Sequence, residues 1–365
     1  MAYIVSVGKC LPEFNSTQET AVEFAKEMFK ETFKDINRLL TVFQNGEIQS
    51  RQFAKELDWY KQEHSFKEKN DTYITNAVTL GVKAIKACLS NSKLLSRPID
   101  YEEIDAIFFI SSTGLSTPSI DAKIINHLPF KESIKRIPIW GLGCAGGAAG
   151  LSRAFEYCRA FPDAKVIVLS VEFCSLTFQR DDQSKSNLIG TSLFADGVAC
   201  TCIVGEAVDQ KKYSKLSNIP RILGTNSTFM KNSEEVMGWD IKNNGFYVVF
   251  SRDIPSLINK WLKPNVESFL DDYKMSLTDI SHFVAHPGGK KVLDAYKKGL
   301  EFSEFHLHIS REVLSKHGNM SSVTVMYVLE AYLEREVAAC EDFGLIGALG
   351  PGFSSELLLV KWEAV

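Results

Sequence analysis

The chain has 365 residues, of which 45% are hydrophobic and 24% charged, the balance of an ordinary globular protein. At about 150 residues per domain, this length predicts two units. Lys and Arg number 41 and Asp and Glu 45, and the resulting net charge of −4 argues against a nucleic-acid partner.

The N-terminus and the cysteines indicate a compartment. MAYIVSVGKC lacks the cationic stretch, apolar run and small-residue cleavage site of a secretion signal. No apolar stretch approaches the roughly 18–20 residues of a membrane-spanning helix. The eight cysteines are scattered, mostly inside apolar runs, which is typical of reduced and buried thiols. We therefore expect a cytoplasmic protein.

The first hundred residues predict one strand and then helices. Residues 2–10 read as a short strand. Ser16 and Glu19 stand at capping-box spacing, and residues 21–43 carry apolar side chains at helical intervals, so one long helix is expected there. Residues 48–71 are polar enough to lie at the surface, and 71–89 read as a further helix.

From residue 105 onward, apolar strands alternate with helices. Strands are expected at 105–112, 137–140, 164–172 and 197–206, with a helix after a glycine-rich turn at 146–161. The last third repeats this order. The matching order predicts an α/β protein built from a duplicated unit, with parallel strands between helical layers and a division into 1–213 and 214–365. Functional loops in such folds gather at the carboxyl ends of strands.

Cys144 is the candidate nucleophile. It lies in GLGCAGGAAG, directly before the expected helix, where the helix dipole and unpaired backbone N–H groups favour a thiolate. Flanking glycines let a substrate carbonyl approach the backbone, so the Cys144 N–H could serve as an oxyanion donor. The alternative is a small core cysteine in a tightly packed turn.

His286 and Asn319 could complete an acyl-transfer site. His286 ends an apolar strand in HFVAHPGGKK, where the following proline and glycines force a turn. Asn319, in KHGNMSSVTV, opens an expected helix, so a simple N-cap is its alternative role. In a Cys–His–Asn set, the histidine activates the thiol and the asparagine adds a donor for an enolate.

These motifs resemble those of the type III (chalcone synthase-like) polyketide synthases of the thiolase fold. GLGCAGG resembles the family's nucleophile motif, AHPGGKK its histidine motif and HGNMSS its asparagine motif. The resemblance runs in order from about residue 5 to 362, and is closest to bacterial alkylpyrone-forming synthases of the Bacillus type. It implies a homodimer of five-layered αβαβα subunits that needs no metal and no permanently bound cofactor.

The resemblance also implies a reaction. A starter acyl group, a fatty one by the resemblance to the Bacillus-type synthases, would pass from acyl-CoA to Cys144. Malonyl-CoA would be decarboxylated with its enolate held by His286 and Asn319, and the enolate would attack the Cys144 thioester. Repeated extension would give a chain that cyclises to an alkylpyrone or a resorcinol.

Further residues are assigned only through the resemblance. GALGPGFSSELLL corresponds to a loop that shapes the cavity, and NLIGTSLFADG to a segment with a gatekeeping phenylalanine. VEFCSLTF corresponds to a cavity-lining stretch, and SRQFAKEL to a segment that meets the CoA phosphates, for which a solvated helix face is the alternative. The expected substrate contacts are Gly350, Pro351, Gly352, Phe194, Cys174 and Thr177, and the expected CoA contacts are Arg51 and Lys55.

The sequence departs from the plant members of the family at two expected substrate contacts. Thr117 stands where many plant enzymes carry a methionine that reaches across the dimer. Ser256 stands where they keep a glycine that sets cavity size. These departures argue against plant aromatic starters and leave the three central residues unchanged.

Three other classes of protein share part of this pattern of residues. A ketoacyl synthase III of fatty-acid synthesis would show Gln-Ala-Asn after the histidine, where this chain has Pro-Gly-Gly. A papain-like protease would need an aromatic-flanked cysteine near a secreted N-terminus. A silent acyl-CoA-binding protein of the same fold would have no need for a thiol at a helix start. Cys200 and Cys202 alternate on an expected strand without a second ligand pair, which favours core packing over a metal site.

Overall fold

A nine-stranded sheet organises the chain in the computed structural model, which describes residues 1–31, 33, 35–251 and 254–365. The strand order is β11-β12-β13-β8-β1-β7-β6-β4-β5. Five of these strands come from the first half of the chain: β1 (Ala2–Cys10), β4 (Ala106–Ser111), β5 (Lys135–Trp140), β6 (Lys165–Phe173) and β7 (Asp196–Gly205). The other four come from the second half: β8 (Asn218–Phe229), β11 (His282–Ala285), β12 (Phe343–Gly350) and β13 (Ser354–Ala364).

The two groups of strands are joined by a short seam. β1 and β8 pair only at Ala2 with Ile222 and Tyr3 with Arg221, whereas β1 pairs with β7 along almost its whole length. The sheet is therefore close to being two sheets, one from each half, that meet at one corner. The division at 213/214 itself stays a prediction.

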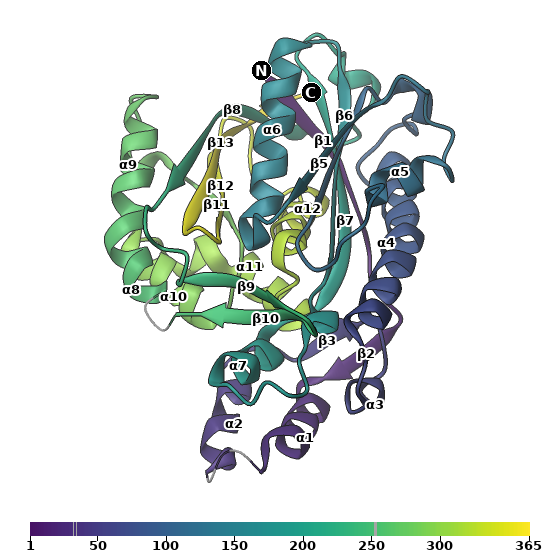
Figure 1. Cartoon of the computed structure of the whole chain (residues 1–365). Coiled ribbons are helices and arrows are strands. Elements are labelled where there is room, and N and C mark those ends of the chain that lie inside the picture. The colour runs from purple at the N-terminus through teal and green to yellow at the C-terminus, as the bar shows by residue number, and fades with distance from the viewer. Residues whose placement is uncertain (32, 34, 252–253) are drawn as a thin grey trace.

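Two helices fill the space between these sheets (Figure 1). They are α6 (Gly146–Ala160) and α12 (Thr324–Glu334), and both contact strands of the two halves. Every residue of α12 from Thr324 to Leu333 is buried, as a helix in a central layer requires. On the outer faces, α4 (Phe66–Leu89) covers β1, β6 and β7, and α11 (Glu304–His317) covers β11. The layer order is thus the predicted αβαβα.

Strand direction differs from the expectation of parallel strands. The pairs β4–β5, β4–β6 and β11–β12 are parallel, but β6–β7, β12–β13 and all pairs of β1 and β8 are antiparallel. Only three residues separate β12 from β13, and so short a connection can join only antiparallel neighbours. The sheet is mixed.

The long helix predicted over 21–43 is wrong. Two helices stand there, α1 (Gln18–Phe29) and α2 (Ile36–Gln44), and each has its own cap. The side chain of Thr17 accepts from Thr20 N, and that of Asp35 from Arg38 N. Ser16 is not the cap, because Thr17, the last residue of β2 (Phe14–Thr17), holds that position; β2 pairs with β3 (Ser50–Phe53).

The other helices and the hairpin lie around this framework. A capping box of Ser65 and Glu68 starts α4 at Phe66, five residues earlier than predicted. Within the described ranges, no helix is long and apolar enough to span a membrane. The remaining elements are α3 (Leu57–Tyr60), α5 (Ile120–Ile125), α7 (Lys185–Leu193), β9 (Met237–Lys242), β10 (Gly245–Phe250), α8 (Ile254–Leu257), α9 (Lys263–Asp271) and α10 (Lys290–Gly299).

Candidate active site

Cys144 lies in a 3₁₀ turn, Gly143–Ala145, that leads directly into α6. The backbone N–H of Gly143 donates to Ser112 Oγ at 2.9 Å, which ties the turn to the end of β4. A Cβ added at Gly147 would lie 2.1 Å from the carbonyl oxygen of Ser322. The glycines after Cys144 therefore let the start of α6 press against the turn that precedes α12.

The Gly350-Pro351-Gly352 turn packs against the same place. A Cβ at Gly350 would stand 2.5 Å from the carbonyl oxygen of Leu142, and one at Gly143 would stand 2.7 Å from Pro351 Cδ. The turn between β12 and β13 thus forms one wall of the Cys144 site. Its contact with substrate stays a prediction.

His286 follows the last residue of β11 and is 2% exposed. Its backbone N–H donates to Gly347 O at 2.8 Å, which continues the β11–β12 ladder past the strand end. Within the described part of the chain, neither ring nitrogen has a hydrogen-bond partner. Burial lowers the pKa of His286 to about 3, so the ring is neutral and free to accept a proton.

Asn319 connects the three residues. Its Nδ2 donates to Gly288 O at 3.0 Å, and Gly288 is close enough to the imidazole that an added Cβ would lie 3.6 Å from His286 Nε2. Its Oδ1 accepts from Ser321 N at 2.8 Å, at the start of the 3₁₀ turn Ser321–Val323 before α12. Met320 holds the N-cap position of that turn, and the role of Asn319 toward an enolate stays a prediction.

The ionisation of Cys144 corrects the expectation of a thiolate. Burial raises the pKa of the thiol to about 11, hydrogen bonds with the Ser321 and Asn319 side chains oppose that rise, and the charge of Glu172 adds to it. Although the thiol keeps some open surface toward the cavity, protein atoms surround it, and desolvation outweighs the helix dipole. The resting pair is a neutral thiol and a neutral imidazole.

A buried carboxyl group beneath the site escaped the sequence analysis. Glu172 in β6 accepts from Ser112 N, Thr113 Oγ1 and Ser322 Oγ, and it is fully buried. Burial raises its pKa to about 7, and the three hydrogen bonds limit that rise. One acidic residue within the apolar run of β6 was the available signal. Glu172 links β4 to the segment that follows Asn319.

Phe194 forms another side of the site that contains Asn319. It follows the last residue of α7, and a parallel bridge pairs it with Asn319. Two aromatic rings from the β9–β10 hairpin lie against it, Trp239 at 5.7 Å and Phe250 at 5.6 Å between centroids. The hairpin therefore brings Trp239, which the sequence analysis did not select, to the expected gatekeeper.

Ser256 does not line the cavity, and its assignment is corrected. It is exposed on α8, past the end of the β9–β10 hairpin. The resemblance had matched Ser256 to a glycine that sets cavity size in plant enzymes. In this chain Ser256 follows the hairpin strands at residues 237–250. The hairpin residues whose rings contact Phe194 are Trp239 and Phe250.

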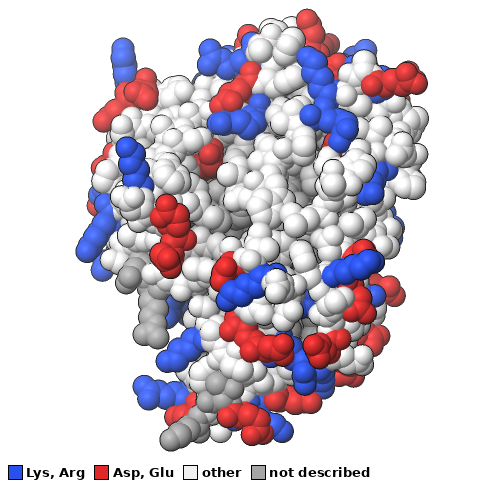
Figure 2. Space-filling view, viewed as in Figure 1, with Lys and Arg blue, Asp and Glu red and all other residues white. Residues whose placement is uncertain are grey.

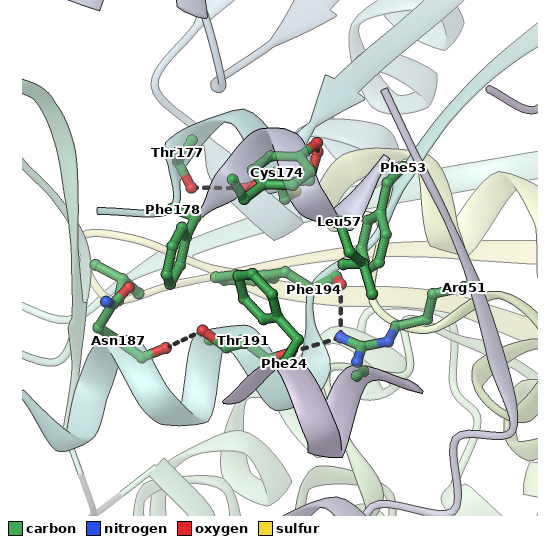
Figure 3. A pocket seen from close by; sticks show the side chains of 15 residues that line it. Phe24, Arg51, Phe53, Leu57, Cys174, Thr177, Phe178, Asn187, Thr191 and Phe194 are labelled. Atoms are coloured by element: carbon green, nitrogen blue, oxygen red, sulfur yellow. Dashed lines mark hydrogen bonds between the residues drawn. The ribbon is translucent and has the colours of Figure 1, made fainter. Parts of the chain in front are cut away.

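An apolar pocket lies beside Phe194, Cys174 and Thr177 (Figure 3). Its cavity volume is about 50 Å³, and its lining atoms come from α1, α3, α7, β3, β10 and the turn Cys174–Thr177. Burial raises the pKa of the Cys174 thiol, and the charge of Glu172 adds to that rise. The lining residues are Ala21, Phe24, Arg51, Phe53, Leu57, Tyr60, Cys174, Ser175, Thr177, Phe178, Asn187, Gly190, Thr191, Phe194 and Val248.

The two expected CoA contacts differ in their placement. Arg51 lies in strand β3 and is 1% exposed. Its guanidinium donates hydrogen bonds to the carbonyl oxygens of Thr191 and Phe194 and to Gln18 Oε1. It offers no solvent-facing charge to a phosphate, which corrects the expectation for this residue. Lys55 is half-buried on the turn after β3, and its role stays a prediction.

Thr117 lies on an exposed loop between β4 and α5. Its neighbour Leu115 is 40% exposed, and Trp140 on the edge strand β5 is 46% exposed.

Cys200 and Cys202 are both fully buried in β7. No group of three His, Cys, Asp or Glu side chains among the described residues could hold a metal ion.

A cysteine at the start of the central α6, with a histidine and an asparagine from the other half beside it, defines a condensing enzyme that transfers acyl groups. The chain belongs to the chalcone and stilbene synthases. The N-terminal domain of that family matches residues 1–207 and the C-terminal domain matches residues 221–363. The protein is therefore a type III polyketide synthase of the thiolase fold, a class whose substrates are CoA thioesters.

Individual proteins agree with this assignment. The chain is 56% identical over 363 residues to a protein of Bacillus subtilis named as a chalcone synthase, covering 100% of this chain and 99% of that one. It is 28% identical to the alpha-pyrone synthesis polyketide synthase-like Pks18 of Mycobacterium tuberculosis, covering 98% and 91%. The crystal structure of 1,3,6,8-tetrahydroxynaphthalene synthase from Streptomyces coelicolor superposes with a TM-score of 0.91 at 25% identity, covering 100% of both chains.

Proposed function

We propose that this type III polyketide synthase uses fatty acyl-CoA starters, extends them with malonyl-CoA and releases alkylpyrones or resorcinols. In the first step, Cys144 passes its proton to His286 and its sulfur attacks the starter thioester. The Cys144 N–H serves as an oxyanion donor, and the tetrahedral intermediate expels CoA as a thiolate, which takes up a proton. The starter is then held as a thioester on the enzyme. The neutral, unpartnered imidazole of His286 supports its role as the acceptor.

Extension needs an enolate beside that thioester. Malonyl-CoA loses carbon dioxide, and the electron pair of the broken bond becomes the enolate of acetyl-CoA. Asn319 has one amide N–H engaged with Gly288 O, and its second N–H, with the His286 ring, can donate to the enolate oxygen. The enolate carbon attacks the Cys144 thioester, the new carbon–carbon bond forms, and the cysteine leaves as a thiolate.

The apolar pocket beside Phe194 is the observation that carries the starter assignment. Most of its lining is aliphatic or aromatic, which suits an alkyl chain and gives a carboxylate or hydroxyl few partners. Its volume of about 50 Å³ is small, so a long alkyl chain would have to displace lining side chains to enter it. A chain attached to Cys144 could extend along it.

Two aromatic side chains set the depth of this pocket. Tyr60 and Phe178 line both the pocket and a second cavity of about 390 Å³ at the surface beyond it. Tyr60 is fixed by a hydrogen bond between its hydroxyl and Ser175 Oγ at 2.6 Å, while Phe178 packs edge-on against Phe24 at 5.5 Å. We infer that starters long enough to reach this wall fill the pocket best.

The products follow from the relatives as well as the pocket. Pks18 carries alpha-pyrone synthesis in its name, and the solved neighbour makes tetrahydroxynaphthalene. A starter whose alkyl chain stays in the pocket presents only its newly added β-keto units to the space near Cys144. Ring closure among those units leaves an alkyl substituent, as in an alkylpyrone or an alkylresorcinol.

We further propose a homodimer that works in the cytoplasm. Figure 2 shows charged side chains around the rim of one face and a largely uncharged central area over α6 and β5. Exposed Leu115, Thr117 and Trp140 on the β4–α5 loop and β5 suit burial against a second copy. All eight cysteines are free thiols, which suits a reducing compartment. Lys55 remains our candidate for a CoA phosphate contact.

The test is mass spectrometry of products from the purified protein, malonyl-CoA and acyl-CoA starters from acetyl to long-chain fatty acyl and aromatic. We expect tri- and tetraketide pyrones or resorcinols, with the highest yield from fatty acyl starters. Cys144→Ala should abolish them because no thioester can form. Equal yields from aromatic and fatty starters would contradict the starter assignment, and products from Cys144→Ala would contradict the nucleophile.

A further inference from the structure

Arg51 is the largest fully buried side chain that the proposed reaction leaves unused. Its Nη1 donates to Thr191 O at 2.7 Å and to Phe194 O at 3.0 Å, and its Nη2 donates to Gln18 Oε1 at 3.0 Å (Figure 3). Its Nε has no partner among the described residues. A buried guanidinium with one unsatisfied donor costs stability, so its retention calls for a role.

Among the described residues, no carboxylate offsets this cost by a direct ion pair. The acidic group whose charge acts on Arg51 is Asp196, whose oxygens accept from Ala54 N, Ser175 N and Ser175 Oγ. Its charge only partly opposes the desolvation that lowers the pKa of Arg51 to about 9. The direct partners of Arg51 are instead the carbonyl oxygens at the C-terminal end of α7, which a cation stabilises.

The second of those carbonyls belongs to Phe194, which a parallel bridge pairs with Asn319. Asn319 N donates to Leu193 O, and Ala195 N donates to Asn319 O, both at 2.9 Å. The aliphatic stem of Arg51 also touches the other side of this bridge, since a Cβ at Gly318 would lie 2.8 Å from its Cγ and Cδ. Arg51 therefore holds the Phe194 backbone with its head and supports the residue before Asn319 with its stem.

We propose that Arg51 is a positioning residue, which fixes the register between Phe194 and Asn319 and so places the Asn319 amide for decarboxylation of malonyl-CoA. This inference rests on the proposed function. It predicts a selective effect, because the turn that carries Cys144 is held by Ser112 and Pro351 and makes no use of Arg51. Loading of a short starter such as acetyl-CoA, which does not need the pocket that Arg51 also lines, should survive a change that impairs decarboxylation.

The experiment compares Arg51→Met, Arg51→Lys and, as a control, Arg159→Met, which removes an exposed arginine at the far end of α6. Loading is measured as the fraction of protein that gains the starter acyl mass on Cys144. Decarboxylation is measured as release of carbon dioxide from malonyl-CoA, per loadable site. We expect Arg51→Met to lower decarboxylation between about tenfold and a hundredfold, since a shift near 1 Å is enough for such a loss. Loading of acetyl-CoA, whose chain is too short to need the pocket that Arg51 lines, should stay unchanged.

Arg51→Lys keeps the stem and one charged donor, so its decarboxylation should fall between that of the wild type and that of Arg51→Met. If Arg51→Met does not fold, the ratio of decarboxylation to loading in Arg51→Lys decides, and a ratio equal to wild type overturns the proposal. Equal loss of both steps, or no loss in Arg51→Met, also overturns it. A wild-type protein that cannot decarboxylate malonyl-CoA would refute the proposed function instead.

Discussion

Glu172→Gln should change how stability depends on pH. In the folded chain, burial raises the pKa of Glu172 from 4.5 to about 7, so the folded state holds this proton more tightly than the unfolded state. Its contribution to stability is complete below pH 4.5 and is lost as the pH rises through 7. With those two values, wild type should lose roughly 2 to 3 kcal/mol between pH 5 and pH 8 through this group.

Glutamine can keep most of the hydrogen bonds. Its oxygen can accept from Ser112 N and Thr113 Oγ1, and its amide can donate to Ser322 Oγ, which now accepts. The variant therefore lacks the ionisation without leaving an empty site. The stability difference between Glu172→Gln and wild type should move in favour of the variant by roughly 2 to 3 kcal/mol from pH 5 to pH 8.

The assay is urea unfolding followed by tryptophan fluorescence at fixed protein concentration, since any dimer would couple to folding. Glu132→Gln, in an exposed turn, serves as the control and should leave the pH dependence of wild type unchanged. Asp196, whose pKa is also raised to about 7 by burial, titrates in every protein compared and cancels in the difference. Parallel curves for wild type and Glu172→Gln would refute the reasoning.

Three further outcomes are expected. Asn319→Ala should slow decarboxylation more than starter loading, measured as carbon dioxide release and as acyl mass on the enzyme; equal losses would argue against its role with the enolate. Phe178→Ala should remove part of the wall of the apolar pocket and shift the preferred starter to a longer chain in competition assays, whereas an unchanged preference would place the alkyl chain elsewhere. Gly147→Ala should lower the melting temperature by several degrees, because its new Cβ would stand 2.1 Å from the carbonyl oxygen of Ser322; a wild-type melting curve would show that the helix start can move.

The sequence predicted best what depends on local pattern. Long apolar runs located β4, β6 and β7 within one or two residues, because a buried strand has few alternatives. The motifs around Cys144, His286 and Asn319 led to side chains that the structure links through Gly288 and Ser321. Glycine-rich spacing carried this information, since close backbone contacts tolerate no other residue.

What failed depends on partners far away in the chain. Arg51 was expected through the resemblance to contact the CoA phosphates, with a solvated helix face as the alternative, whereas it is buried and donates to the carbonyl oxygens of Thr191 and Phe194. Ser256 was assigned to the cavity only because plant enzymes keep a cavity-size glycine at the corresponding position, whereas here it is exposed on α8. The thiolate expected at Cys144 failed for a third reason: desolvation is a property of the assembled layers.

Because the active site is built across the central helix layer, it forms only when the two halves of the chain have packed together. Cys144 stands where α6 begins, and His286 and Asn319 are brought to it by strands and helices of the other half, while the two sheets touch directly at only two residue pairs. Neither half alone could hold an enolate beside a thioester. Chemistry therefore becomes possible only in molecules whose halves have docked, so partly assembled chains would spend no malonyl-CoA.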